Sequence, residues 1–519
     1  MSTELAFGWR PIENGYSSGL DFLGLAAPIE GILDTETSGI TNATARARYF
    51  SIVPWYYWRY TQLGGEGSAA DQRRFAIGFE MLLAYANIAW LEKTESSMSG
   101  IIRREYCEKV WKKRKDSLPL RDGDVGDTPS PLDAALYGPS LRRLSLLGRH
   151  SQVHTCRDAG KIMAEELDKS LRHLSGYEDL VDASHISSSM VQEWADHLCL
   201  EQPTEREAEL LTALLFSFAE FEQDEVPPRV FTMMLFLNMG LTTDSAFTSS
   251  TIEEALATGL DLSGKSFTPE SILKATHTRW RILAILKFLR HASELAFAAI
   301  HRRVKDGTTR FANAESAAFD LIRQTTQQTS RIPASYSDLL KKYESGASPP
   351  GWKPEDESPE LVLRHALKLC AWCHAMLRTE SGLKLLDDEM ARVGQHLDAD
   401  LLGYYEQLED LIEKDTEVTL RWLCVDRAVA RHFQVASRKL VQHDTFRLIE
   451  DEEGVRATDK CPIADVAIRI DSMLSLVADV KLLQRSDAGY ATIPVTKPWF
   501  ADHVARISSS LNPPVDGAP

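Results

Sequence analysis

The stretch "CAWCH" contains two cysteines and a histidine whose types and spacing are typical of metal ligands. Cys370 and Cys373 would supply two thiolates, and structural zinc takes four such ligands in tetrahedral geometry. Two His-x-Cys pairs could complete the set: His154 with Cys156, or His197 with Cys199. A zinc site, and with it a zinc-dependent enzyme, is therefore one hypothesis.

The same stretch has two other interpretations. Cys-x-x-Cys-His is the attachment pattern of c-type haem, which requires export, but the first residues lack the basic and apolar regions of a signal peptide. The surrounding residues "LVLRHALKLCAWCHAMLR" have helical apolar periodicity, with Cys370 and Cys373 on the apolar stripe. Buried structural thiols without a cofactor are the favoured interpretation.

A second candidate is "GITNATARARYFSIVPWYYWRY", residues 39–60, which holds seven aromatic residues and three arginines. Such residues can stack on and pair with a nucleic-acid strand, or they can form a structural clasp. The residues concerned are Arg46, Arg48, Tyr49, Trp55 and Tyr57. We expect Asn42 to cap a helix through Val53 that Pro54 kinks or ends.

Helical spacing places one arginine of this segment on each of two apolar faces, so both guanidinium groups are expected to be buried. A buried charge needs an opposite charge nearby. The expected carboxylates come from the N-terminal segment: Asp21, Glu30, Asp34 and Glu36. A clasp between this segment and the first helix is the favoured interpretation.

A third set is basic and precedes a predicted β-hairpin around residues 451–454. Its members are Arg427, Arg431, Arg438 and Lys439, on a helix expected over residues 416–441. A helix followed by a hairpin resembles a winged helix, in which this set would contact DNA. The hairpin tip "EDEEG" is acidic and would repel phosphates, which favours a protein partner.

The elements that must position these residues are mainly helical. Thr204 and Glu207 form a capping-box pattern, and a long buried helix is expected from Thr268-Pro269-Glu270 to Gly307. We expect a mainly α, multi-lobed protein with a small β-hairpin or winged-helix-like element near the C-terminus. Loop composition predicts consecutive regions: 1–120 with the Arg/aromatic segment, 132–344, 358–487 with the hairpin, and a loose tail over 488–519.

The composition excludes some classes of protein. A formal net charge of −17 opposes a surface that coats a polyanion. Seven cysteines in 519 residues are too few for a disulfide framework and indicate reduced thiols, so we expect a cytoplasmic protein without a membrane span. Phosphate-loop, dinucleotide-binding, nucleophile-elbow and His-Glu-x-x-His motifs are missing, which disfavours familiar enzymes and leaves us without a catalytic residue to name.

The stretch "GITNATARARYFSIVPW", after "GLDFLG" and "ILD", resembles the N-terminal signature of a group of large uncharacterised bacterial proteins. In that signature a short turn leads into T-x-R-A-R-Y-[FY] and then P-W. The matching positions are Gly39, Asn42, Thr44, Arg46, Ala47, Arg48, Tyr49, Phe50, Pro54 and Trp55. The resemblance extends through the words "EMLLAYAN" and "YGPSLRRLSLLG", and it transfers no functional residue.

The resemblance implies a setting, because genes of that group occur beside helicases and other nucleic-acid enzymes in anti-phage defence clusters. We therefore expect a non-catalytic scaffold or regulatory subunit that binds other proteins of a defence complex. Any contact with DNA is expected to be indirect. Direct nucleic-acid binding or sensing through the Arg/aromatic segment is the alternative, and a zinc-dependent enzyme is the second alternative.

Overall fold

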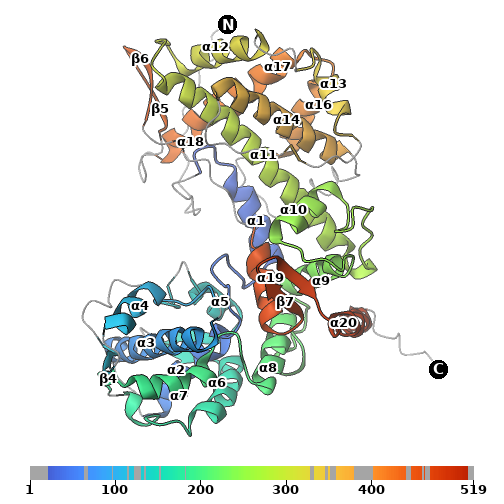
Figure 1. Ribbon diagram of the computed structural model, residues 1–519. Helices are drawn as coiled ribbons and strands as arrows, with labels where there is room; N and C mark the ends of the chain where they lie inside the picture. The colour runs from blue at the N-terminus through green and yellow to red at the C-terminus, as the bar shows by residue number, and fades with distance from the viewer. Residues whose placement is uncertain are drawn as a thin grey trace, which may run out of the picture. The chain divides into compact units, whose positions relative to one another are not determined.

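The computed structural model describes most of the chain (Figure 1). The described residues are 21–63, 68–95, 98–113, 116–121, 130–133, 136–150, 153–181, 183–327, 332–344, 349–350, 358–378, 401–439, 446–458, 461 and 468–511. They form helices and small two-stranded sheets, which confirms the mainly α fold class. The chain divides into two compact units: unit 1 is Met1–Ile32 with Thr278–Val466, and unit 2 is Leu33–His277 with Ala467–Pro519.

The first half of unit 2 is a group of packed helices. They are α2 (Tyr49–Gln62), α3 (Ala69–Thr94), α4 (Arg104–Lys113), α5 (Gly138–Arg143), α6 (Asp158–Leu171) and α7 (Ser188–Leu198). The closest pairs are α2 with α6 and α3 with α7 (Figure 1). Among the described residues, α3 alone is long and apolar enough to cross a membrane, but 89% of its apolar window is buried, as in a core helix.

The second half of unit 2 combines segments that lie far apart in the sequence. It contains α8 (Glu205–Phe216), α9 (Pro228–Gly240), α10 (Ser249–Thr258), α19 (Ile470–Asp479) and α20 (Thr496–Leu511). Three strand pairs belong to this unit: β1 (Leu118–Pro119) with β4 (His185–Ile186), β2 (Leu147–His150) with β3 (Val153–Cys156), and β7 (Leu483–Ser486) with β8 (Gly489–Thr492). All three pairs are antiparallel.

Unit 1 is built on a long helix, α11 (Lys274–Lys305), which follows a 3₁₀ turn at Ser271–Leu273. Its other helices are α12 (Ala314–Gln327), α13 (Tyr336–Lys341), α14 (Pro359–Arg378), α16 (Leu401–Asp410), α17 (Thr416–Arg421) and α18 (Arg431–Lys439). A π-helical stretch, η5 (Trp422–Ala430), joins α17 to α18. The boundary between the two units falls within α11 and within α1 (Ala26–Glu36).

The expected hairpin is confirmed in unit 1. Strands β5 (Leu448–Asp451) and β6 (Gly454–Ala457) pair with Asp451 opposite Gly454. Gly454 has a φ of +115°, and its α-hydrogen side lies against the Phe311 carbonyl, where a Cβ would come within 2.4 Å. The expected helix over 416–441 is also present, as α17, η5 and α18 in succession.

Two C-terminal expectations differ from the structure. A single helix over residues 461–485 is expected, but α19 ends at Asp479 because Lys481 adopts a left-handed backbone with φ +62°, and β7 follows. The region 488–519, expected to be a loose tail, contains β8 and α20 up to Leu511. Phe500, His503 and Ile507 recur at helical spacing and are buried, which is the apolar stripe that holds α20.

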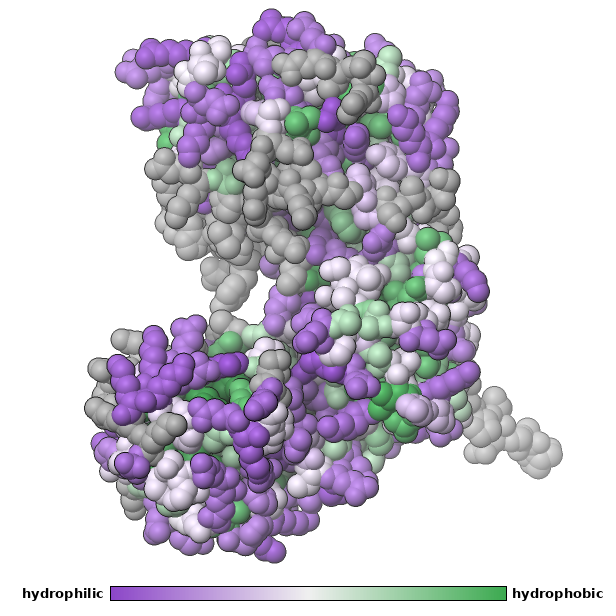
Figure 2. All heavy atoms as spheres, in the orientation of Figure 1, coloured by the Kyte–Doolittle hydropathy of each residue, from purple (hydrophilic) through white to green (hydrophobic). Residues whose placement is uncertain are grey.

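The face of the molecule that Figure 2 presents is mostly polar. On this face (Figure 2), hydrophilic residues cover most of both units and hydrophobic residues form small separated patches. The large side chains with the least exposure include four tryptophans and two arginines: Trp55, Trp194, Trp280, Trp372, Arg46 and Arg48. Because buried guanidinium groups require charged or polar partners, the surroundings of Arg46 and Arg48 form the candidate functional site.

Candidate functional site: a buried arginine clasp

The backbone before α2 is irregular and is fixed by local hydrogen bonds. Gly39 has a φ of +86°, which glycine adopts without steric cost. In the turn that follows, the Thr44 hydroxyl accepts from the Thr41 amide at 3.0 Å and donates to the Thr41 carbonyl at 2.7 Å. The Arg46 amide then donates to the Tyr137 hydroxyl at 2.7 Å. Arg46 therefore lies outside the helix on which the sequence predicts it.

Helix α2 begins at Tyr49, so Asn42 does not cap it, and its N-cap residue is Arg48. Pro54 lies inside α2, which continues to Gln62, so the expectation that Pro54 ends the helix is wrong. A proline in an early turn removes one helical hydrogen bond. Dense packing compensates, since every residue from Tyr49 to Tyr57 is buried.

Arg48 forms a bidentate ion pair with Glu207 of α8. Its Nε lies 3.0 Å from Oε1 and its Nη2 lies 2.8 Å from Oε2 of Glu207, and both side chains are 1% exposed. The Arg48 Nη1 also donates to the Cys199 carbonyl at 2.5 Å, and the Ser51 hydroxyl donates to Glu207. This satisfies most of the donors of one guanidinium and both oxygens of one carboxylate inside the core.

The role of Glu207 differs from the expected capping box. Thr204 caps α8 by accepting from the Glu207 amide at 3.2 Å, as predicted. The Glu207 carboxylate does not return a hydrogen bond to Thr204, because it receives Arg48 and Ser51 instead. Half of the capping box is therefore replaced by a tertiary ion pair.

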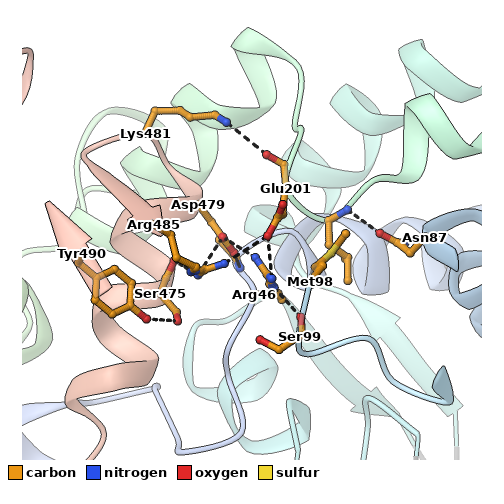
Figure 3. Close-up of polar contacts among 12 residues, drawn as sticks. Arg46, Asn87, Met98, Ser99, Glu201, Ser475, Asp479, Lys481, Arg485 and Tyr490 are labelled. Carbon is orange, nitrogen blue, oxygen red and sulfur yellow. Dashed lines mark hydrogen bonds and ion pairs between the residues drawn. The ribbon is translucent and has the colours of Figure 1, made fainter. Parts of the chain in front are cut away.

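Arg46 connects the N-terminal segment with the C-terminal part of unit 2 (Figure 3). Its Nη1 lies 3.1 Å from Asp479 Oδ1 at the end of α19, and its Nη2 lies 2.9 Å from Glu201 Oε1. Its Nε donates to the Ser99 carbonyl at 2.9 Å. The second Asp479 oxygen accepts from the Ala47 amide at 2.9 Å. The three guanidinium nitrogens of Arg46 and the Ala47 amide thus point to oxygen atoms of three separate segments.

Arg485 of β7 adds a second cation beside the same carboxylates. Its Nη groups lie 3.4 Å from Asp479 Oδ1 and 3.5 Å from Glu201 Oε1 (Figure 3). Burial raises the pKa of the Asp479 carboxyl, and the two guanidinium groups of Arg46 and Arg485 oppose that rise. Glu201 and Arg485 are each 28% exposed, so only this outer edge of the network reaches solvent.

Asn87 on α3 positions the segment that carries Glu201. Its side-chain amide donates to the Leu198 carbonyl at 3.0 Å. It also accepts from the Leu200 amide at 2.9 Å, which is the bond that Figure 3 draws at Asn87. Lys481 also donates to the Glu201 carbonyl at 3.2 Å. We call the set Arg46, Arg48, Glu201, Glu207 and Asp479 the arginine clasp.

The clasp uses carboxylates other than those the sequence suggests, Asp21, Glu30, Asp34 and Glu36. The two arginines pair with Glu201, Glu207 and Asp479. Asp21 instead accepts from the Leu25 and Ala26 amides at the start of α1. Asp34 pairs with Arg469 at 2.6 Å. The expected neighbours in sequence are therefore replaced by distant ones.

The aromatic members of the predicted set are buried around the clasp. The Tyr49 hydroxyl accepts from the Ile102 amide at 2.9 Å, and burial raises the pKa of this tyrosine. The Trp55 indole donates to Asp168 of α6 at 3.0 Å. Tyr57 lies 5.4 Å from the His154 ring, centroid to centroid, and is 3% exposed. Their faces are used in packing rather than offered to a ligand.

The basic set of α18 and η5 contacts the protein itself. Arg431 donates to the Leu23 carbonyl at 3.0 Å, and Lys439 donates to the Asp21 carbonyl at 2.5 Å. Arg427 lies 4.1 Å above the Tyr404 ring and donates to Gln407 at 2.7 Å. Arg438 is exposed. Arg427, Arg431 and Lys439 of the predicted nucleic-acid contacts thus have internal partners.

The cysteine pair lies in the core of unit 1. Cys370 and Cys373 are one turn apart on α14 and are 0% exposed. Burial raises the pKa of Cys370 to about 12 and that of Cys373 well above its usual value, which favours thiols over the thiolates that bind zinc. Among the described residues, no group of three or more His, Cys, Asp or Glu side chains could hold a metal ion.

The two His-x-Cys pairs belong to unit 2 and have other contacts. His154 and Cys156 lie on β3, where Gln72 exchanges hydrogen bonds with the His154 backbone and the Cys156 thiol donates to the Pro54 carbonyl at 3.0 Å. Cys199 follows α7, and its carbonyl accepts from Arg48. The third member of "CAWCH", His374, lies 2.9 Å from Glu409 and 3.1 Å from the Tyr336 hydroxyl.

The residues that sequence reasoning missed are the three carboxylates of the clasp. Glu207 has a signal only as a member of the Thr204 capping pattern, which does not indicate an ion pair. Asp479 is a lone acid within the apolar run "MLSLVADVKLL", which is a mark of a buried charge with a partner.

No protein-family model, curated protein or solved structure matches the chain.

Proposed function

We propose that this protein is a non-catalytic scaffold or regulatory subunit that binds other proteins of a bacterial anti-phage defence system. In this role it would hold or control nucleic-acid enzymes of that system without performing the chemistry itself. The N-terminal signature supports the bacterial and defence setting, and the burial and pairing of the reactive side chains described above support a role without catalysis.

The observation that carries the proposal is the closure of the arginine clasp. Arg46 and Arg48 are each 1% exposed and have dedicated carboxylate and carbonyl partners. A catalytic or ligand-binding cation must reach its ligand, and binding here would require at least one ion pair in the core to break. Breaking such a pair costs about 3–5 kcal/mol. The signature residues therefore hold the fold together, which supports a structural role for this segment.

Net charge supports proteins over naked nucleic acid as direct partners. The chain carries a formal charge of −17, and the basic set on α18 spends Arg431 and Lys439 on backbone carbonyls. Phosphate contacts require exposed cations that displace counterions. The nucleic-acid alternative therefore has less support, and a salt titration of filter binding with single-stranded DNA is its direct test.

The proposal is tested by co-expression with the products of the adjacent genes. The tagged full-length chain is purified by affinity and size exclusion, with each neighbour added in turn. We expect at least one neighbour to co-elute in a fixed ratio and its activity to change when this chain is added. A chain that elutes alone with every neighbour would contradict the proposal.

A further inference from the structure

A second feature of the molecule, in unit 1, is a surface hollow between α12 and α17. Its volume is about 1060 Å³, and residues 332–334 form one wall. The apolar lining is Phe311, Phe319, Ile322, Ile332, Pro333 and Val418. We call it the α12–α17 groove. Volumes of this size are typical of sites that hold a ligand or several side chains of a partner.

The groove exposes apolar side chains that the fold does not cover. Among the described residues, five large hydrophobic side chains are highly exposed, and two of them, Phe319 at 38% and Val418 at 43%, line this one hollow. Arg421 lies over the Phe319 ring at 4.9 Å. Exposed apolar residues that gather in a concave surface with a polar rim mark interaction sites.

The walls of the groove are held in place by backbone contacts. The Thr416 hydroxyl donates to the Pro333 carbonyl at 2.6 Å, and the Thr416 amide donates to the Ala334 carbonyl at 2.9 Å. The Tyr336 amide donates to the Lys414 carbonyl at 3.1 Å. The start of α17 is therefore fixed against residues 333–336, so a ligand would meet a preformed surface with little ordering cost.

The cationic and acidic side chains around the groove differ in how they are paired. The cations already have partners, since Arg303 and Arg323 both pair with Asp320 and Arg421 stacks on Phe319. Asp415 and Glu417 are exposed, and within the described part of the chain neither side chain has a hydrogen bond or ion pair.

The β5–β6 hairpin adds acidic charge beside the groove. It docks next to Phe311, whose carbonyl accepts from the Val455 amide at 3.0 Å. The exposed hairpin tip carries Asp451, which pairs with Arg456, and the carboxylates of Glu452 and Glu453. Together with Asp415 and Glu417 these carboxylates make part of the rim acidic, which favours a basic ligand there.

We propose that the α12–α17 groove binds an amphipathic segment of a partner protein, with apolar side chains on Phe319 and Val418 and flanking Lys or Arg near Asp415 and Glu417. The inference rests on the proposed function and names the surface through which it would act. Helix-in-groove recognition of this kind depends on a few apolar anchors, and the charges set orientation and specificity.

The first test uses a defined probe. A fluorescein-labelled peptide of eighteen residues, with Leu at helical spacing and Lys elsewhere, is titrated with the full-length chain and followed by anisotropy. A Leu/Glu peptide of the same pattern is the charge control. We expect saturable binding of the Leu/Lys peptide that is at least about tenfold tighter than that of the Leu/Glu peptide and weakens with salt.

The variants separate groove binding from attraction to an acidic protein. Val418→Asn keeps the charge and should weaken the Leu/Lys peptide by about tenfold or more, and Phe319→Ser should do the same. Val495→Asn is the matched control, because Val495 is 50% exposed and lies in unit 2, and it should leave binding unchanged. Equal binding by wild type and Val418→Asn would overturn the proposal, as would equal affinity for the two peptides.

Failure of the groove and failure of the proposed function give different results. If a genomic neighbour co-elutes with wild type and with Val418→Asn alike, the groove is not its site and the function stands. If the Leu/Lys peptide binds in the groove but no neighbour co-elutes, the function falls and the groove stands. A concentration-dependent dimer that Val418→Asn abolishes would identify a second copy as the occupant and overturn the proposed partner.

Discussion

Cationic side chains fix N-terminal segments in both units, but with different partners. In unit 2, Arg46 and Arg48 pair with the carboxylates of Glu201, Glu207 and Asp479. In unit 1, Arg431 and Lys439 donate to the backbone carbonyls of residues 21–23. Loss of Arg48 would leave the buried Glu207 carboxylate without its ion-pair partner, whereas loss of Arg431 would remove a donor from the neutral Leu23 carbonyl. The two regions therefore differ in how strongly the fold depends on each cation.

The largest effect is expected for Arg48→Met. Glu207 would remain charged in the core without its partner, which costs about 3–5 kcal/mol in free energy of unfolding. Urea unfolding measures the loss, and hydrogen exchange should assign it to α2 and α8. Arg206→Met is the matched control, because Arg206 is 50% exposed and solvent screens its ion pairs, so the free energy of unfolding should change little.

The next effect is a dependence of the free energy of unfolding on pH, and in unit 1 we expect it to come from the buried histidine His432. His432 is 0% exposed, and its Nε2 lies 3.1 Å from the Arg447 amide, so it accepts a hydrogen bond there as the neutral form. Burial lowers the pKa of His432 from 6.5 to about 4. Between these values the unfolded chain binds more protons than the folded chain, so acidification lowers stability.

The measurement is the free energy of unfolding at pH 7 and at pH 5. His432 should contribute a loss of about 2 kcal/mol over this range. His432→Gln can still donate and accept hydrogen bonds but does not titrate, so its pH dependence should be shallower by that amount. An unchanged slope in the variant would show that His432 is not held neutral.

A smaller effect is expected for Arg431→Met. The substitution removes a charge-assisted hydrogen bond to the Leu23 carbonyl, which is a neutral acceptor, and this costs about 1–2 kcal/mol. Thermal unfolding and hydrogen exchange at the start of α1 would measure it. A loss for Arg431→Met that equals or exceeds the loss for Arg48→Met would contradict the comparison between the two units.

The features of the fold that depend on local pattern could be predicted. Apolar periodicity indicates the long helix, although α11 begins at Lys274 after a 3₁₀ turn and not at the expected cap Thr268. The β-prone arms around an Asp-to-Gly turn indicate the hairpin at Leu448–Ala457. The residue types around Lys481 do not indicate its left-handed backbone conformation, so the end of α19 could not be predicted from the sequence. A lysine carries no preference for that conformation.

The two arginines of the candidate site could be predicted from the sequence, but their carboxylate partners could not. Arg46 and Arg48 are conspicuous because charges in an apolar, aromatic segment require partners. The partners lie 159 positions away in Glu207 and 433 positions away in Asp479, and local spacing says nothing about such contacts. The contacts place residues 467–519 with 33–277 in one unit, whereas loop composition predicts consecutive regions.

The central claim is that the Arg/aromatic segment holds architecture together instead of meeting a ligand. A double-mutant cycle with Arg48→Met and Glu207→Gln tests it most directly, with urea unfolding as the readout. We predict a coupling energy of about 2–3 kcal/mol, so that the double variant is little worse than either single variant. A coupling near zero, with Arg48→Met as stable as wild type but unable to bind a genomic neighbour, would contradict the claim.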